Sequence, residues 1–275
     1  MKTSQTKTTQ IPPESYLAAA IDAARTAGRI QVRALGRPHT IGYKAETDLV
    51  TEVDRASERA IVERIRRSFP DHDFLLEESP FRPKGSSFLW IVDPLDGTTN
   101  YTHGLPHFCT SIALEHKGRT VVGVVFDPVR RELFTALRGR GAFLNGRRIR
   151  VSRESKLIRS MLATGFPKNI RTVRDKNLRR FARALMQARG IRRSGSAALD
   201  LCYLAAGRID GYWVLNLAPW DSAAGILAAR EAGARITDLE GRPTRYGSRG
   251  IIATNGRIHA ALLDLLSGPR RQRTV

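Results

Sequence analysis

Apolar and polar positions along the chain change repeatedly between helical and strand spacing. Residues 51–68 place apolar side chains at helical spacing, and Asn145-Gly146 is typical of a tight β-hairpin. Further helices are predicted at 15–32, 176–189, 196–206, 222–232 and 259–266. Strands are predicted at 74–76, 88–92, 108–115, 120–127, 132–137, 160–164, 211–215, 234–237 and 251–253. This order predicts a mixed α/β or α+β fold, in which the three strands between 108 and 137 pair antiparallel.

The length of 275 residues fits one large domain or two closely packed halves. We expect a single domain over 1–275, with halves near 11–150 and 151–268 and an arginine-rich stretch at their junction. The polar ends, 1–10 and 268–275, lie outside the predicted elements.

Composition narrows the class of protein. No apolar segment approaches the roughly 20 residues of a membrane span, and residues 1–10 lack the apolar core of a signal peptide. The two cysteines, Cys109 and Cys202, lie far apart, which favours a reducing compartment without a disulfide framework. We therefore expect a cytoplasmic enzyme with no membrane partner.

The formal net charge of +20 is high, and its basic residues concentrate in 130–159, in 168–193 and in the tail at 270–273. One interpretation is a solvated, arginine-rich surface. The other is attraction of anions, either phosphorylated metabolites or RNA. Aromatic residues are not interleaved with these arginines, which argues against a platform for stacking single-stranded bases.

Residues 90–100, with the sequence WIVDPLDGTTN, carry the most informative chemistry. A short strand ends at Asp93, a second carboxylate follows at Asp96, and then come Gly97 and Thr98. Mg²⁺ prefers carboxylate and phosphate oxygens, and exposed backbone N–H groups at a turn favour a phosphate. Metal and phosphate sites side by side indicate phosphoryl chemistry, although Asp-Pro and Asp-Gly are also common in ordinary turns.

Three further acidic positions each have a structural alternative. Asp54 completes a capping box with Thr51 at the start of the 51–68 helix. Glu77 lies in a charged turn after a short strand. Asp221 fits the N-cap of the following helix, although the small residues after it would allow close approach to that helix start.

Taken together, these segments resemble the inositol monophosphatase family of Mg²⁺-dependent, lithium-sensitive phosphomonoesterases. The shared motifs are D-L-V-T-x-x-D, E-E-S, W-I-V-D-P-L-D-G-T-T-N-Y-x-H-G-x-P and W-D-x-A-A-G, in the order and with the spacing of the family. The resemblance extends over residues 15–266. It implies a layered α-β-α-β-α sandwich, usually a homodimer, that hydrolyses a small phosphorylated metabolite.

The resemblance also implies a role for each matching residue. Two to three Mg²⁺ ions would be held by Glu77, Asp93, the backbone carbonyl of Leu95, Asp96 and Asp221. The phosphate would be held by the backbone of Gly97 and Thr98 and by Lys44. Thr98, Asp54 and Glu77 would be catalytic, with Thr98 Oγ, supported by Asp54, orienting the water that the metal activates. The rest of the substrate would contact Asp96, Asp221, Gly195, Ser196 and Ala197.

This chemistry needs no covalent phosphoenzyme, because one cation can activate a water while another stabilises the departing alkoxide. Neither cysteine lies near these motifs in the sequence, which disfavours a cysteine-phosphatase route. His103 and His107 have the spacing of a zinc-binding helix, but Gly104 and Pro106 between them make a helix improbable. His103 is expected instead to pack or to form hydrogen bonds in its loop.

The chain departs from the family pattern at two positions. Val214 stands where relatives that act on inositol phosphate have a glutamate that binds ring hydroxyls, seven residues before Asp221. A valine cannot accept those hydrogen bonds, and a site without them can lose discrimination. Leu76 replaces the usual glycine before E-E-S, whereas the turn at 195–197 keeps the family pattern.

Three functions stay open at this point. The first is hydrolysis of inositol 1-phosphate or a related sugar phosphate. The second is hydrolysis of a more anionic substrate by the same fold, such as fructose 1,6-bisphosphate, a 3′-phosphoadenosine nucleotide or histidinol phosphate. The third is binding of RNA or a transcription antitermination complex, as some bacterial relatives do, for which steep salt dependence would be the signature.

Overall fold

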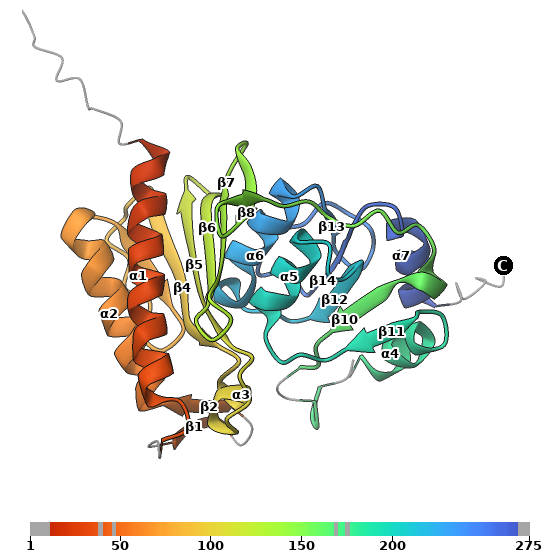
Figure 1. Ribbon diagram of the computed structural model, residues 1–275, viewed down its shortest axis with the longest axis horizontal. Coiled ribbons are helices and arrows are strands. Elements are labelled where there is room, and N and C mark those ends of the chain that lie inside the picture. Colours follow the sequence, from red (N-terminus) through yellow and green to blue (C-terminus); the bar gives the residue numbers. More distant parts are fainter. Residues whose placement is uncertain (1–11, 38–40, 46–47, 168–169, 174–176, 269–275) are drawn as a thin grey trace, which may run out of the picture.

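The computed structural model describes residues 12–37, 41–45, 48–167, 170–173 and 177–268. Helices and sheets alternate in five layers (Figure 1). Helices α1 and α2 cover the outer face of a seven-stranded sheet, and α5 and α6 lie between this sheet and a five-stranded sheet. Helices α4 and α7 form the last layer. The predicted α-β-α-β-α sandwich is therefore confirmed.

The seven-stranded sheet has the order β3-β4-β5-β6-β7-β8-β9. Strands β3 and β4 are parallel, and every later neighbouring pair is antiparallel, as predicted for the strands between 108 and 137. Its strands are β3 (Asp73–Leu76), β4 (Phe88–Asp96), β5 (Cys109–His116), β6 (Arg119–Asp127), β7 (Glu132–Leu137), β8 (Gly141–Leu144) and β9 (Arg147–Arg148).

The five-stranded sheet has the order β11-β10-β12-β14-β13. Strand β10 runs parallel to both of its neighbours, whereas β14 is antiparallel to β12 and β13. Its strands are β10 (Met161–Thr164), β11 (Gly190–Arg192), β12 (Gly211–Leu215), β13 (Arg235–Thr237) and β14 (Gly250–Thr254). A separate antiparallel pair consists of β1 (Ile41–Ala45) and β2 (Asp48–Thr51).

Local sequence explains where several helices begin. Pro13 and Pro219 occupy first-turn positions of α1 and α6, where a residue without an N–H loses no hydrogen bond of the helix. Thr51 caps α2 in the predicted capping box. Ser196 caps α5 by accepting a hydrogen bond from the backbone N–H of Leu199. The helices are α1 (Pro13–Ala34), α2 (Glu52–Ser68), α3 (Thr98–Thr102), α4 (Leu178–Leu185), α5 (Ala197–Ala205), α6 (Pro219–Glu231), α7 (His259–Ser267) and a 3₁₀ turn at Leu157–Arg159.

Helix α6 is buried on all sides because it lies between the two sheets. All residues from Ser222 to Ala229 are buried, and most are small. A helix with apolar residues on every side is stable only where other parts of the protein cover all of its sides. Gly123 of β6 allows the strand and the helix to pack closely, since a Cβ there would lie 2.8 Å from the carbonyl oxygen of Ala224 and 3.2 Å from its Cα.

Some predicted boundaries were wrong. Strand β4 continues through Pro94 to Asp96, because an irregularity in its pairing with β5 accommodates the proline. The helix predicted over residues 176–189 ends early, because α4 stops at Leu185. The residues between it and strand β11 form a turn. Helix α6 begins three residues earlier than predicted, since Pro219 sets its first turn. The short elements β1, β2, α3, β8, β9 and β11 were not predicted individually.

The described part of the chain contains no helix with the length and apolarity that spanning a bilayer requires.

Stability should depend on the pH through His259, which is fully buried at the start of α7. Its Nε2 pairs with Thr237 Oγ1 and its Nδ1 with Thr254 Oγ1, both at 3.0 Å, and burial lowers the pKa of His259 to about 4. The unfolded chain binds a proton below about pH 6.5, which the folded chain does not. The free energy of unfolding should therefore fall by about 2 kcal/mol between pH 7 and pH 5 through this group.

Urea unfolding of the protein and of His259→Gln at both pH values checks this expectation. The variant should be less stable at pH 7 but should lose less stability on acidification. An identical pH-dependent loss in both proteins would contradict the assignment to His259.

Candidate active site

Three carboxylates from three different parts of the fold meet at one point. Glu77 follows β3, Asp93 lies in β4, and Asp221 lies in the first turn of α6. Each offers one oxygen, and these oxygens lie within 4.8 Å of one another. The backbone N–H of Glu77 donates to the carbonyl of Val92 at 3.2 Å, which joins the end of β3 to β4. The parallel pairing of β3 and β4 thus brings Glu77 beside Asp93.

The alternative interpretation of Asp221 as an N-cap was wrong. Ala218 is the N-cap of α6, and Asp221 is the third helical residue, whose Oδ2 accepts a hydrogen bond from the backbone N–H of Ala218 at 3.0 Å. Pro219 at the first position fixes this register. The side chain of Asp221 therefore supports its helix and meets the other two carboxylates at the same time.

The electrostatics of this cluster favour a cation. Asp93 is only 1% exposed. Burial raises the pKa of Asp93 well above its usual range, and the negative charges of Glu77, Asp96 and Asp221 raise it further. A buried carboxylate among other carboxylates is costly unless something positive compensates it. Hard oxygen ligands of this kind fit Mg²⁺, so the residues present suit the ion that the sequence predicted.

Asp96 is placed differently from the other three carboxylates. Its Oδ2 accepts hydrogen bonds from Ser196 Oγ at 2.6 Å and from the backbone N–H of Ala198 at 2.8 Å. It does not belong to the group of three carboxylates, Glu77, Asp93 and Asp221, whose oxygens meet within 4.8 Å. Asp96 therefore joins the D-P-L-D-G turn to the start of α5, and it brings the predicted substrate turn, residues 195–197, next to the carboxylates.

A second network surrounds Thr98 at the start of α3. Thr98 Oγ1 lies 3.2 Å from Asp54 Oδ1 and 3.1 Å from the carbonyl oxygen of Leu95, and it can donate its single proton to either of them. The other oxygen of Asp54 accepts from the backbone N–H and Oγ1 of Thr51, at 2.8 and 2.5 Å. Burial raises the pKa of Asp54 in spite of the hydrogen bonds from Thr51, and the charge of Glu77 also raises it. Asp54 is thus a partner of Thr51 in the capping box, as predicted, and it also contacts Thr98; its catalytic role stays a prediction.

Gly97 adopts the left-handed conformation that the turn requires, with φ of 103°. A Cβ at this position would lie 3.0 Å from the carbonyl oxygen of His107. Replacement would therefore strain both the backbone conformation and the packing. This conformation places Gly97 directly before Thr98, where α3 begins.

Asn100 is a structural contributor that sequence reasoning missed. Its Nδ2 donates to the carbonyl oxygen of Ser194 at 2.9 Å and to that of His107 at 2.8 Å. Gly195, with φ of +92°, lies against the same amide. Asn100 and Ser194 are separated by 94 residues, so no local pattern could reveal this contact.

The structure corrects one expectation about the cysteines. Cys109, at the start of β5, lies beside the site, with its Sγ 3.9 Å from Asp96 Oδ2 and 3.6 Å from Ser196 Oγ. It is fully buried, and burial raises the pKa of its thiol well above the usual range. A neutral thiol is a poor nucleophile. A cysteine-phosphatase route is therefore disfavoured by the raised pKa of Cys109, and not by its distance from the motifs.

His103 forms hydrogen bonds in its loop, as expected, with its Nδ1 2.8 Å from the carbonyl oxygen of Thr99. Lys44 belongs to β1, but its side chain lies outside the described residues. Val214 is buried in β12 among the apolar residues between the sheets. Tyr212, two residues earlier on the same side of β12, has a raised pKa owing to burial and then to the charges of Asp200, Asp96 and Asp221. Val214 and Tyr212 belong to the same cluster of buried residues as Ile91 and Cys109 of the seven-stranded sheet.

Comparison with known proteins agrees with this geometry. The family model described as the inositol monophosphatase family matches residues 13–268. The chain belongs to the inositol monophosphatase family. Membership of this family identifies it as a phosphoric monoester hydrolase, and the family is in general Mg²⁺-dependent.

Individual relatives and solved structures cover nearly the whole chain. The Nus factor SuhB of Pseudomonas aeruginosa is 46% identical over 254 residues, which are 90% of this chain and 94% of that protein. The extragenic suppressor protein SuhB from Bartonella henselae has a TM-score of 0.88 and 42% identity, covering 93% of this chain and 100% of its own. The inositol monophosphatase from Anabaena (Nostoc) sp. has a TM-score of 0.85 and 41% identity, covering 94% of this chain and 98% of its own.

Proposed function

We propose that the protein hydrolyses inositol 1-phosphate or a related sugar phosphate in a Mg²⁺-dependent reaction. The observation that carries this proposal is the convergence of Glu77, Asp93 and Asp221 around one point between the two sheets. Family membership supports the reaction class, and the carboxylate geometry supports the metal.

The proposed ligands of two to three Mg²⁺ ions are carboxylates and one carbonyl. When bound, the ions supply positive charge that activates water and stabilises the leaving oxygen. The ligand set is Glu77, Asp93, Asp96, Asp221 and the backbone carbonyl of Leu95. We expect Gly97, Thr98 and Lys44 to hold the phosphate, and Asp96, Asp221, Gly195, Ser196 and Ala197 to contact the rest of the substrate. Lithium inhibition and a homodimer, both usual in the family, are further expectations.

Thr98 and Asp54 are proposed to orient the attacking water, with Glu77 as the third catalytic residue. Because Thr98 Oγ1 donates its own proton to Asp54 or to the carbonyl of Leu95, its lone pairs point elsewhere and can accept a hydrogen bond from water. The capping contacts of Thr51 hold the Asp54 carboxylate in place. The network thus fixes the direction of one hydroxyl at the edge of the carboxylate cluster.

Thr98→Ala should lower kcat by about 10²-fold, because it removes the hydroxyl that orients the water. The KM for substrate should change much less. Thr98→Ser restores the hydroxyl and should recover most of the activity, which separates orientation from simple packing. Steady-state kinetics at saturating Mg²⁺ measures both, and equal kcat values for the alanine variant and the unmodified protein would exclude Thr98 from catalysis.

The identity of the substrate depends on Val214. The Val214 side chain cannot accept hydrogen bonds from ring hydroxyls. This position therefore gives the site no means of preferring inositol phosphate over other sugar phosphates. Phosphate release should be measured for inositol 1-phosphate, fructose 1,6-bisphosphate, 3′-phosphoadenosine 5′-phosphate, histidinol phosphate and β-glycerophosphate. Strong turnover of one substrate identifies it, and no Mg²⁺-dependent turnover of any of them would overturn the proposal.

A second candidate function is participation in a transcription complex. Two observations favour it: relatives that share 46% identity carry the name Nus factor SuhB, and the net charge is +20. A basic surface would bind RNA mainly through phosphates, and such binding weakens steeply as salt increases. RNA binding titrated at several salt concentrations tests this role, and affinity that does not change with salt would argue against it.

A further inference from the structure

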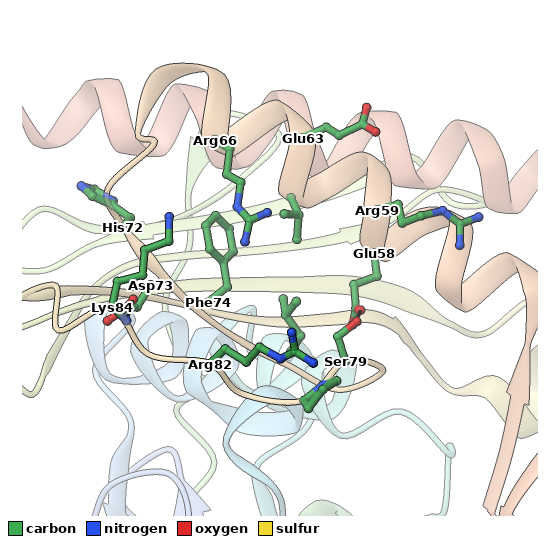
Figure 2. Close-up of a pocket in the computed structure, with 13 residues that line it drawn as sticks. Glu58, Arg59, Glu63, Arg66, His72, Asp73, Phe74, Ser79, Arg82 and Lys84 are labelled. Carbon is green, nitrogen blue, oxygen red and sulfur yellow. Dashed lines mark hydrogen bonds between the residues drawn. The ribbon is translucent and has the colours of Figure 1, made fainter.

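A cavity of about 470 Å³ lies on the opposite side of α2 from α1 (Figure 2). One wall is α2, and the other is formed by β3 and the loop that follows it. Its volume falls within the usual range of small-molecule sites. Four basic side chains line it: Arg59 and Arg66 from α2, and Arg82 and Lys84 from the loop.

The three arginines of this cavity, Arg59, Arg66 and Arg82, form no ion pairs within 4.0 Å with the carboxylates of the described residues. Figure 2 shows Arg66 reaching from α2, and Arg82 from the facing loop, toward the same space. Unpaired guanidinium groups on two facing walls are the arrangement that binds phosphate through several charged hydrogen bonds.

The acidic residues that line the cavity have other roles. Glu58 accepts hydrogen bonds from the backbone N–H of Glu78 at 2.9 Å and from Ser79 Oγ at 2.5 Å. Asp73 accepts from the backbone N–H of Lys84 at 2.6 Å and from that of Ser86 at 2.9 Å. These carboxylates hold the loop in its conformation. Glu63 is exposed, and Figure 2 shows it directed away from the cavity.

The floor of the cavity is apolar. Phe74 is buried beneath Arg66, whose guanidinium carbon lies 5.1 Å from the centre of the ring. Val62, Leu76 and Pro80 complete the apolar lining. His72 adds a ring that accepts a hydrogen bond from Trp90 Nε1 and whose pKa is lowered by burial, so it is a neutral wall rather than a cation.

From this arrangement we propose that the cavity binds a phosphorylated small molecule with a flat apolar body, of the nucleoside diphosphate type. The phosphates would lie between Arg66 and Arg82, and the body would pack on the apolar floor beside Phe74. This binding needs no divalent cation, because the positive charge comes from the protein itself. The site is thus chemically distinct from the carboxylate cluster, where anions need Mg²⁺.

Calorimetric titration with ADP in the presence of EDTA tests the proposal, because chelation removes the Mg²⁺ that the carboxylate cluster would need. ADP should bind, pyrophosphate should bind more weakly because it lacks the apolar body, and adenosine should not bind detectably. Absence of ADP binding would overturn the proposal. Pyrophosphate binding as tightly as ADP would contradict the part of it that concerns the apolar floor.

Charge-matched variants separate this site from the general basicity of the chain. Arg66→Gln with Arg82→Gln should weaken ADP binding by about tenfold or more. Arg59→Gln with Arg82→Gln removes the same charge but only one of the two phosphate contacts, and it keeps the contact between Arg66 and Phe74, so it should weaken ADP binding less. The control, Arg147→Gln with Arg153→Gln, removes the same charge from exposed positions outside the cavity and should bind ADP like the unmodified protein. Equal weakening in all three variants would show diffuse attraction and overturn the proposed site.

Discussion

Asp93→Asn should abolish most of the phosphatase activity while leaving the fold intact. The substitution removes one of the three carboxylates that converge at the proposed Mg²⁺ site, and we expect kcat to fall by about 10²-fold or more. In the metal-free protein, burial and then the charges of Glu77, Asp96 and Asp221 raise the pKa of Asp93, so a neutral amide in its place relieves both burial of charge and repulsion. The amide of asparagine has nearly the same shape, and the melting temperature in EDTA should therefore stay the same or rise.

Thermal unfolding with and without Mg²⁺ distinguishes loss of the metal from loss of the fold. The unmodified protein should gain stability when Mg²⁺ is added, because a ligand that binds only the folded state stabilises it. Asp93→Asn should lose this gain. The matched control is Asp264→Asn, an exposed position on α7, which should keep both activity and stabilisation. Full activity in the Asp93 variant would refute the proposed ligand set.

Gly123→Ala should lower the free energy of unfolding by about 1–3 kcal/mol. The added Cβ would lie 2.8 Å from the carbonyl oxygen of Ala224, and backbone atoms in a buried helix cannot rotate away as a side chain could. Helix α6 must then shift away from the seven-stranded sheet. Because Asp221 belongs to the first turn of this helix, the apparent affinity for Mg²⁺ should fall together with stability.

Urea unfolding and a Mg²⁺ titration of activity measure the two effects. The control is Gly190→Ala, since a Cβ there would meet nothing closer than a side-chain nitrogen of Arg192 at 3.5 Å. It should change stability by no more than about 0.5 kcal/mol and should leave the Mg²⁺ titration unchanged. A Gly123 variant as stable as the unmodified protein would show that α6 can move away from the seven-stranded sheet without loss of free energy of unfolding.

The longer elements follow from their patterns because their packing repeats the same contacts at regular intervals. Helix α2 shows this, since Val53, Ile61 and Ile65 face the core at helical spacing and Thr51 caps it as predicted. Short elements escape such reasoning: β11 has three residues and α3 has five. The start of α6 was misplaced because Asp221 suits an N-cap and the third helical position equally well.

The composition of the candidate site was accessible from the sequence only through resemblance to a family. Periodicity places Asp93 at the end of a strand, but it cannot say that Glu77 and Asp221 meet it. The contacts of Asn100 with Ser194, and of Cys109 with Asp96, depend on how the strands and turns pack in three dimensions. The division into halves near residue 150 and the roles of the individual site residues stay predictions.

The position of α6 between the two sheets has a consequence for synthesis on the ribosome. Every strand of the seven-stranded sheet is complete by Arg148, so this sheet can begin to form while the rest of the chain is still being translated. Asp221 follows much later, and its helix is covered only when β13 and β14 have also emerged. A nascent chain therefore holds Glu77 and Asp93 well before it can bring the third carboxylate to them. Premature termination before α6 would release a protein without this central helix and without a complete carboxylate cluster.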